Sequence, residues 1–167
     1  DIEGAELSVF NSCPKVMDEL LAIKTEVSFM PFRDSQPLAN ELDLFVQEMG
    51  FELMDIIDPV HWRRHGHVIH PYCSNETPSY SRGQIVQADY LYFRKPDDLN
   101  EHIPKTLKLS LIALALGYFD HALMVLENPK VANFLLSEFG KTPVDIVATA
   151  SKKFGNRVYF QALYRQI

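Results

Sequence analysis

The sequence contains few cysteines and no long apolar segment. Its two cysteines, Cys13 and Cys73, are too few for a disulfide framework and suit a reducing compartment. No apolar run reaches the roughly 18 residues that a transmembrane helix needs. The longest run, residues 107–116, is interrupted by Lys108 and Ser110. No signal peptide is visible. We therefore expect a cytoplasmic protein with no membrane partner.

Positive charge is also scarce. The 16 Lys and Arg residues are outnumbered by 22 Asp and Glu residues, which gives a formal net charge of -6. A nucleic-acid-binding surface is normally basic, so this balance argues against a nucleic-acid partner. Hydrophobic residues make up 47% of the 167 positions, which excludes a disordered chain and predicts a sizeable packed core.

Hydrophobic spacing in the first half of the chain alternates between helix and strand. Apolar residues recur at helical spacing over 5–13, and a second helical stripe over 38–49 ends at Gly50. Three segments are strand-like: 22–30, 51–57 and 84–94. The order helix, strand, helix, strand is that of a parallel sheet with covering helices. Residues 58–83 have no clear period, which predicts a long irregular loop.

The pattern after residue 95 is helical throughout. One helix face combines Leu107, Leu111, Leu114 and Ala115, and Gly117 closes it. The run Thr142-Pro143-Val144-Asp145 predicts a helix start, with an N-cap, a proline at the first helical position and an acid in the first turn. We expect four or five short helices that form a packing module or a protein-interaction surface.

The chain opens on the turn Asp1-Ile2-Glu3-Gly4, which leads directly into a helical pattern. Acidic residues at a strand-to-helix junction lie at the edge of an open α/β sheet where ligands bind. The strand that should precede this turn is missing, and Asp1 is not an initiator Met. We therefore expect the chain to be the C-terminal part of a longer enzyme.

Three blocks occur in the order and spacing of a known family: DIEGAELSVF, KTEVSFMPFRDSQPLANELDLFVQEMGFELMDI and GQIVQADYLYFRK. They resemble the C-terminal half of the FkbM family of S-adenosylmethionine-dependent methyltransferases. The resemblance implies a Rossmann-like class I methyltransferase sheet over 1–95, mostly parallel with its last strand antiparallel, and an α-helical extension over 96–167. It also implies methyl transfer from S-adenosylmethionine to a hydroxyl of a sugar or natural-product-like acceptor. This chain would supply the acceptor-side half of the site.

The sequence departs from that family at the cofactor. The glycine-rich loop that cradles the cofactor is absent, and so is the acidic residue that would hold the ribose hydroxyls. We therefore expect S-adenosylmethionine to be bound mainly by a missing N-terminal half, with Asp1 as the residue of this chain that lies at the cofactor. The fragment alone is expected to be inactive.

Three carboxylates are the candidates for catalysis. On the family template Asp1 and Glu3 lie near the methyl donor and the acceptor hydroxyl, where a carboxylate could orient the hydroxyl or take its proton. The alternative role is helix capping, because acids at a helix start are stabilised by its dipole. Glu26 matches a Glu of the family and would be expensive to bury unpaired within a strand.

The residues that follow Glu26 are candidates for substrate binding. Arg33 and Gln36 lie in a polar loop that would overhang the acceptor pocket. A plain solvated loop is the alternative for both residues, and it is the favoured interpretation of Arg33. Asp89 interrupts an apolar strand at a position where the family also has an Asp. We expect it to pair with a backbone or basic group in a structural role.

The segment from His61 to Cys73 combines histidines with an indole and two guanidinium groups. A structural zinc site needs paired ligands at tight intervals and usually several cysteines, so we expect no metal here. The segment would instead form an acceptor-side lid, in which Trp62 provides a stacking face and Arg63 or Arg64 provides hydrogen bonds. A variable surface insertion is the other interpretation.

Two other functions compete with methyl transfer. One is a non-catalytic binding or assembly module that uses the helical tail for an oligomeric or protein contact. The other is a small metal-binding domain built on the histidine-rich segment.

Overall fold

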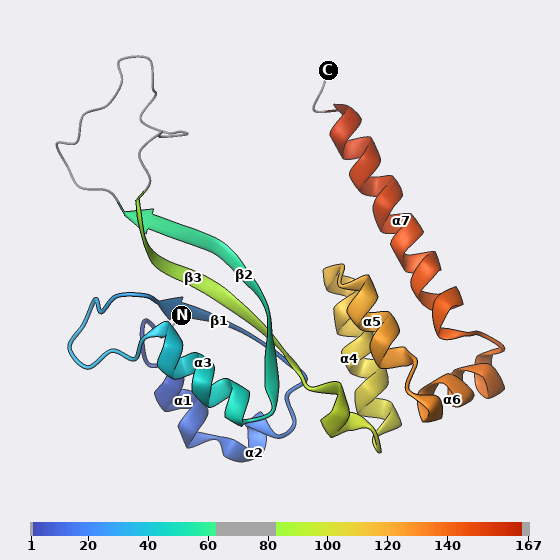
Figure 1. Cartoon of the computed structure of the whole chain (residues 1–167), viewed down its shortest axis with the longest axis horizontal. Coiled ribbons are helices and arrows are strands. Elements are labelled where there is room, and N and C mark those ends of the chain that lie inside the picture. Colours follow the sequence, from blue (N-terminus) through green and yellow to red (C-terminus); the bar gives the residue numbers. More distant parts are fainter. Residues whose placement is uncertain (1, 63–82, 165–167) are drawn as a thin grey trace. The chain divides into compact units, whose positions relative to one another are not determined.

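The structure is a computed structural model that describes residues 2–62 and 83–164 (Figure 1). The chain divides into two compact units, Asp1–Tyr92 and Phe93–Ile167, which we call the sheet unit and the helical unit. The division falls within a strand, β3. Among the described residues, no helix is both long and apolar enough to cross a membrane.

The sheet unit contains three strands, β1 (Ala22–Ser28), β2 (Phe51–Trp62) and β3 (Gln84–Arg94). Their order in the sheet is β1-β3-β2. The arrowheads of β1 and β2 lie at the same end of the sheet, and β3 runs the other way between them (Figure 1). Both hydrogen-bonded pairs are therefore antiparallel, and the prediction of a mostly parallel Rossmann-like sheet is wrong for the described residues.

The physical reason for this error lies in β3. The helix between β1 and β2 returns the chain so that these two strands point the same way, which is the feature that the alternating pattern predicted. However, β3 occupies the position between them, so β1 and β2 share no hydrogen bonds. Pairing with β3 continues past the end of β1, where the Phe29 amide donates to the Val86 carbonyl at 2.9 Å.

Three helices cover one face of this sheet: α1 (Glu6–Ser12), α2 (Pro14–Met17) and α3 (Ala39–Glu48). The helical stripe predicted for 38–49 is confirmed, because Leu42 and Val46 are buried in the core beside Phe51. The helix ends as expected at Gly50, which has a left-handed φ of 86°. The core also contains aliphatic and aromatic side chains from β1, α2 and β3: Met17, Ile23, Val27, Ala88, Tyr90 and Tyr92.

Side chains of β1 alternate between this core and solvent. Ile23, Thr25 and Val27 are buried, whereas Lys24 and Glu26 are exposed. The second face of the sheet therefore carries charged groups, as expected for an antiparallel sheet with one solvated face. β2 continues as a strand through Trp62, so the predicted irregular loop is wrong for residues 58–62. The rest of that loop, residues 63–82, lies outside the described residues.

All the described elements after β3 are helical: η1 (Pro96–Leu99), α4 (Ile103–Leu116), α5 (Phe119–Leu126), α6 (Pro129–Phe139) and α7 (Pro143–Tyr164). α4 and α6 end at Gly117 and Gly140, which both have left-handed φ angles. The predicted start of the last helix is confirmed. Asp145 accepts bonds from both the amide and the hydroxyl of Thr142, at 2.9 and 2.7 Å, and its own amide donates to that hydroxyl at 3.2 Å.

The buried face of α4 combines one leucine with three smaller side chains: Leu109, Thr106, Ser110 and Ala113. The Thr106 hydroxyl donates to the Leu99 carbonyl at 3.0 Å, and the Ser110 hydroxyl donates to the Thr106 carbonyl at 2.9 Å, so neither is buried without a partner. The leucine stripe predicted from the spacing lies elsewhere, and its central residue, Leu111, is 63% exposed.

Candidate functional site

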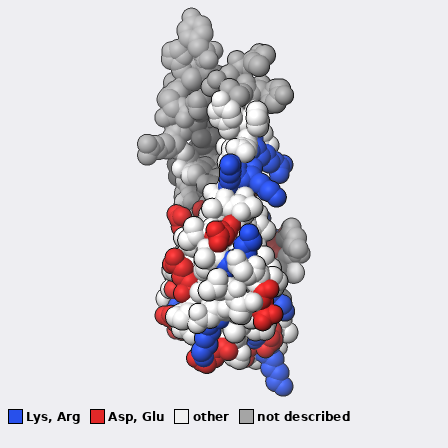
Figure 2. Space-filling view, turned by 90° about the vertical axis from the view of Figure 1, so that its right-hand side faces the viewer, with Lys and Arg blue, Asp and Glu red and all other residues white. Residues whose placement is uncertain are grey.

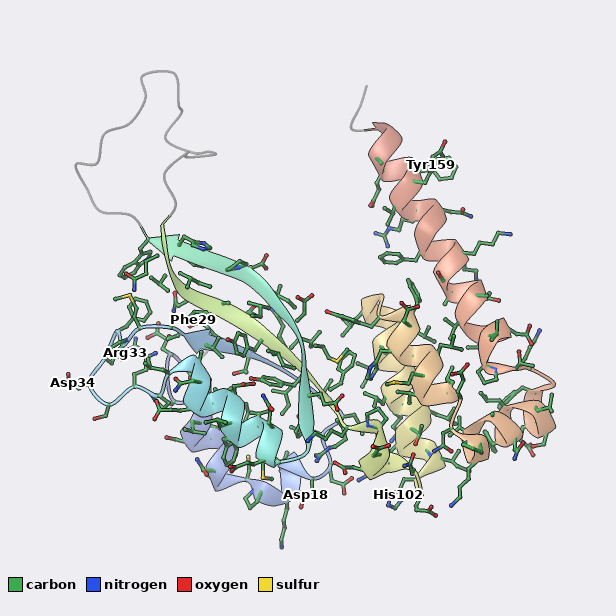
Figure 3. All side chains as sticks on the ribbon, in the orientation of Figure 1. Asp18, Phe29, Arg33, Asp34, His102 and Tyr159 are labelled. Carbon is green, nitrogen blue, oxygen red and sulfur yellow. The ribbon has the colours of Figure 1, made fainter. Side chains whose placement is uncertain are left out.

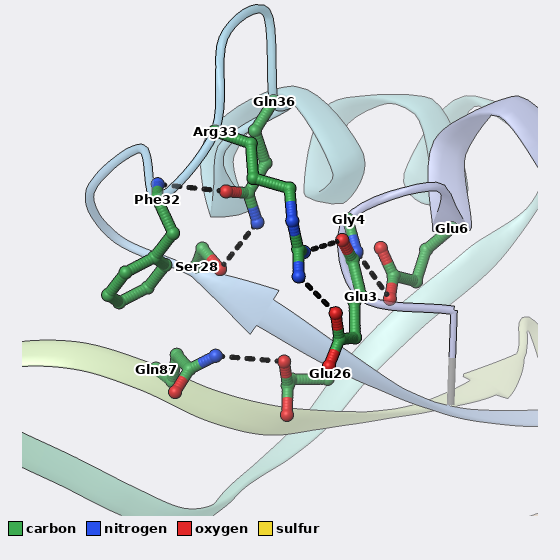
Figure 4. Close-up of polar contacts among 9 residues, drawn as sticks. All are labelled: Glu3, Gly4, Glu6, Glu26, Ser28, Phe32, Arg33, Gln36 and Gln87. Atoms are coloured by element: carbon green, nitrogen blue, oxygen red, sulfur yellow. Dashed lines mark hydrogen bonds and ion pairs between the residues drawn. The ribbon is translucent and has the colours of Figure 1, made fainter.

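Three segments of the sheet unit meet at one end of β1 (Figure 4). They are the turn at residues 2–5, the last residues of β1 and the loop that joins β1 to α3. These segments bring together three of the residues predicted for the site: Glu3, Arg33 and Gln36. A fourth, Glu26, lies beside them on β1. We call this group of contacts the turn cluster.

Glu3 and Arg33 form the outer part of the turn cluster. The Arg33 guanidinium donates to both the backbone carbonyl and the carboxylate of Glu3. Both side chains are more than half exposed, so the ion pair orients the turn more than it stabilises the fold. The acid in the first turn of α1 is Glu6, whose carboxylate accepts a bond from the Gly4 amide at 3.2 Å. No side-chain cap bond is present at the N-cap residue Ala5, so the capping role considered for Glu3 is not seen in the structure.

Gln36 forms the inner part of the turn cluster. Its amide nitrogen donates to the Ser28 hydroxyl at 3.0 Å, and its carbonyl oxygen accepts a bond from the Phe32 amide at 2.9 Å. Gly4 packs directly against this side chain, and a Cβ at Gly4 would lie 2.9 Å from the Gln36 amide nitrogen. Gln36 therefore connects the strand end, the loop and the turn.

Glu26 lies on the exposed face of β1. Its Oε1 accepts a bond from Gln87 Nε2 on β3 at 2.9 Å. The same carboxylate lines an open cavity of about 470 Å³ along β1, together with Phe10 of α1, Lys24 and Asp89. A hydroxylated ligand in this cavity could reach the side chain of Glu26. The contact with Gln87 fixes the carboxylate without burying it.

Lys24 and Asp89 form an ion pair on the wall of that cavity, with Nζ and Oδ2 2.5 Å apart. The hydrogen bond to Asp89 and its negative charge raise the pKa of Lys24 above its usual value. The prediction that Asp89 pairs with a basic group is confirmed. This ion pair therefore has a structural explanation and needs no ligand.

Trp62 lies at the end of β2, where its ring contacts that of Phe32. The ring centroids are 5.0 Å apart, and the planes meet at 70°. Phe32 is also bonded through its amide to Gln36, so the aromatic pair adjoins the turn cluster. The Trp62 side chain is 52% exposed, which leaves much of its surface available for stacking.

Several predicted site residues lie outside the described part of the chain. Asp1 and Arg63 belong to this group, as do Arg64, His65, His67, His70 and Cys73. His61 is described and lies exposed near the end of β2. Among the residues that the structure does describe, no group of three His, Cys, Asp or Glu side chains could hold a metal ion.

The sequence analysis missed Ser28, Phe32 and Gln87. Gln87 could have been found, because polar residues at alternate positions of two strands share a face once the strands pair. The contact of Phe32 with Trp62 joins residues far apart in the chain, and no local pattern indicates it.

The described residues do not fit S-adenosylmethionine. A dinucleotide or nucleoside cofactor usually needs glycines whose backbone a ligand can approach. Gly4 is covered by Gln36, Gly83 would place a Cβ 2.6 Å from the Trp62 carbonyl, and Gly117 lies against Phe154. Gly140 and Gly155 have nothing within 4 Å of an added Cβ, but each stands alone in the sequence, so the described residues contain no glycine-rich loop.

Comparisons of the chain with family models, with curated proteins and with solved structures find no match. The FkbM resemblance therefore stays a prediction from the sequence.

Proposed function

We propose that this chain provides the acceptor side of a site for S-adenosylmethionine-dependent methyl transfer to a hydroxyl, on a sugar or a similar polyhydroxylated molecule. The observation that supports this proposal is the turn cluster. Carboxylate, guanidinium and carboxamide groups from segments far apart in the sequence converge beside an aromatic pair whose Trp62 ring is exposed. Sugar-binding sites use the same chemistry, with planar polar side chains bonding hydroxyls and an aromatic ring stacking on the sugar face.

The chain's residues would bind the acceptor and move its proton. Arg33 and Gln36 offer N–H donors to the acceptor oxygens, and Trp62 offers a ring face. Glu26 is a better candidate for proton acceptor than Glu3. Among the described contacts, Gln87 donates a hydrogen bond to its Oε1, and Oε2 is left for the acceptor hydroxyl. The Glu3 carboxylate is held by Arg33, so its role is to position that guanidinium. A carboxylate that accepts the hydroxyl proton typically contributes a factor of about 10²–10⁴ to turnover.

The structure gives no support for a cofactor site within the described residues, and the methyl donor would be held by other residues. The proposal is therefore limited to acceptor binding and proton acceptance.

Trp62 is the only tryptophan in the sequence and provides a direct test of acceptor binding. The probe is a panel of methyl glycosides titrated to millimolar concentrations while the fluorescence of Trp62 is recorded. At least one glycoside should give a saturable change. Glu26→Gln and Gln36→Ala should each weaken it about tenfold, the effect of losing one bond worth ~1.4 kcal/mol.

Glu52→Gln is the matched control, because Glu52 is an exposed carboxylate on β2 of the same unit. This variant should bind as the wild type does. A flat response to every glycoside, or equal weakening in all three variants, would contradict the proposal.

A non-catalytic assembly module is the second candidate function. The observation that favours it is the exposed apolar surface of the helical unit.

A further inference from the structure

The helical unit exposes much apolar surface. Ten of its large apolar side chains are 47–63% exposed in the described residues: Leu111, Leu116, Met124, Leu136, Phe139, Val144, Phe154, Val158, Tyr159 and Phe160. At roughly 100 Å² each, they expose on the order of 1,000 Å². The largest contiguous apolar patch on a typical monomer covers about 300–600 Å², which is roughly half of this area. The exposed apolar area is therefore large enough to form an interface where its side chains lie together.

Part of this surface forms a groove of about 440 Å³ between α4, α6 and the start of α7. Its lining includes the leucine stripe of α4 and two aromatic rings of α6: Leu107, Leu111, Leu114, Phe134, Phe139 and also Ile146. Ser110 is the one hydroxyl in the lining, and it already donates to the Thr106 carbonyl. The groove thus offers a partner little hydrogen bonding, so its occupant must be apolar.

The second half of α7 lacks a covering element among the described residues. The helix has 22 residues and is therefore about 33 Å long. Phe154 still contacts the unit through the ring of Phe119, with centroids 5.5 Å apart. Beyond it, Val158, Tyr159 and Phe160 are 48–62% exposed, and Figure 3 shows Tyr159 on this outer part of the helix. We call residues 152–162 the outer half of α7; every one of them is exposed.

The spacing of residues along α7 would let its outer half reach the groove of a second copy. Phe160 lies about four turns after Ile146, so it projects from nearly the same side of α7 as this groove residue. In an antiparallel pair of α7 helices, the outer half of one helix lies beside the start of the other. Phe160 of each copy would then reach the groove of its partner.

We propose that the outer half of α7 of one chain occupies the apolar groove of a second copy, and that the second copy does the same in return. This exchange forms a closed two-fold dimer, the commonest symmetry of soluble oligomers. The six exposed side chains that lie in the groove or in the outer half of α7 expose roughly 600 Å² by the same reckoning, which approaches the ~800 Å² that each partner of a standard interface buries. The two equivalent contacts thereby cover the groove and the outer half of α7 in both chains. This proposal is independent of the methyl-transfer proposal.

Charge gives the dimer a property that distinguishes it from other complexes. The outer half of α7 carries Lys152, Lys153 and Arg157, and Asp145 is the only acid in the whole helix. Figure 2, which shows the side of the molecule where α7 lies in Figure 1, has Lys and Arg side chains gathered beside uncharged ones. Two antiparallel copies bring like charges together, so salt that screens them should strengthen the dimer. A complex with an acidic partner would weaken in salt.

Sedimentation velocity of the full chain tests the proposal. The wild type should sediment as a dimer at about 50 µM, and its dissociation constant should fall when NaCl is raised from 50 to 500 mM. Phe160→Glu in the helix and Leu111→Glu in the groove should each give a monomer, with a dissociation constant raised at least 100-fold, because each buries a charge in an apolar contact. Both positions are more than half exposed, so the variants should fold, which circular dichroism checks.

Mixing the two variants is the sharpest part of the experiment. A heterodimer of Phe160→Glu and Leu111→Glu chains retains one intact contact, so the mixture should associate more tightly than either variant alone. Leu44→Glu is the matched control, since Leu44 is 61% exposed on α3 of the sheet unit, and it should leave the dimer unchanged. A monomeric wild type at 50 µM, or a dimer that survives either groove or helix variant, would overturn the proposal.

Discussion

At the scale of single residues, Gly4 and Gln36 explain how Glu3 comes to lie beside Arg33. Glu3 and Gly4 both have left-handed backbone angles, with φ of 44° and 98°. Glycine adopts this conformation without strain, whereas other residues rarely do. Gln36 fills the space that a side chain at Gly4 would need. The turn that presents Glu3 therefore depends on having no side chain at the neighbouring position.

Gly4→Ala should destabilise the sheet unit by about 1–2 kcal/mol, the usual cost of a left-handed alanine, with an added clash against Gln36. Urea unfolding measures the loss. The double variant Gly4→Ala/Gln36→Ala should recover part of it, because the clash disappears while the backbone strain stays. Gly155→Ala is the matched control. Nothing lies within 4 Å of its Cβ position in α7, so alanine there should stabilise the helix by about 0.5–1 kcal/mol.

Tyr92 gives a prediction about alkaline pH. Burial, together with its hydrogen bond to Asp43 at 3.0 Å, raises the pKa of the Tyr92 hydroxyl above its usual value. The unfolded chain releases this proton near pH 10, whereas the folded chain retains it. The free energy of unfolding should therefore fall above about pH 10, by up to ~1.4 kcal/mol per pH unit. Burial also raises the pKa of Tyr90, so Tyr92→Phe should reduce this slope without removing it, and it should cost about 1 kcal/mol at pH 7. An unchanged slope in the variant would exclude Tyr92 as its source.

At the scale of elements, local sequence patterns predicted where helices and strands begin and end better than they predicted which elements pair or pack together. Residues 84–94 were predicted as a strand and are β3, and Thr142 to Asp145 begin α7 as expected. These features depend on neighbours in sequence, which periodicity and capping rules describe. The strand order and the buried face of α4 depend on distant contacts. Thr106 and Ser110 can be buried because their hydroxyls donate hydrogen bonds to backbone carbonyls. Hydrophobicity alone would instead place the leucine stripe on the buried face of α4.

The start of α7 gives a prediction about acidic pH. Bonds from the backbone amide and the hydroxyl of Thr142 lower the pKa of Asp145 below its ordinary value. The stabilisation should be complete above about pH 4, the unfolded value, and should be lost as the pH falls through the folded value. Carboxyl NMR titration of wild type and Thr142→Ala should show the Asp145 pKa rising in the variant. An equal pKa in both proteins would mean that Thr142 does not cap this helix.

At the scale of the whole molecule, the candidate site was only partly predictable. The family resemblance pointed to four described residues: Glu3, Glu26, Arg33 and Gln36. In the fold Arg33 contacts Glu3 directly, and Gln36 packs against Gly4, the neighbour of Glu3. The family's sheet was not found, because the position of β3 is set by pairing and not by any local run of residues. Cofactor binding stays a prediction from the sequence, because the sequence lacks the glycine-rich loop that would cradle a nucleoside.

Calorimetry of the full chain with S-adenosylmethionine should show no saturable heat at micromolar concentrations. The reason is that the sequence lacks the glycine-rich loop that cradles this cofactor, and Gly4 at the turn cluster is covered by Gln36. Adenosine and S-adenosylhomocysteine should behave alike. A dissociation constant in the micromolar range for any of the three would show that this chain holds the methyl donor itself.

The central claim is that the turn cluster binds a polyhydroxylated acceptor, and NMR mapping of amide shifts with a methyl glycoside tests it most directly. The wild type should show saturable shifts at Gly4, Gln36, Gln87 and the indole N–H of Trp62, and Glu26→Gln should reduce them at the same ligand concentration. Amides of α4 to α7 should not move. Saturable shifts confined to the helical unit, or none at any residue up to about 50 mM glycoside, well above the ~1 mM dissociation constant of even weak specific binding, would contradict the account.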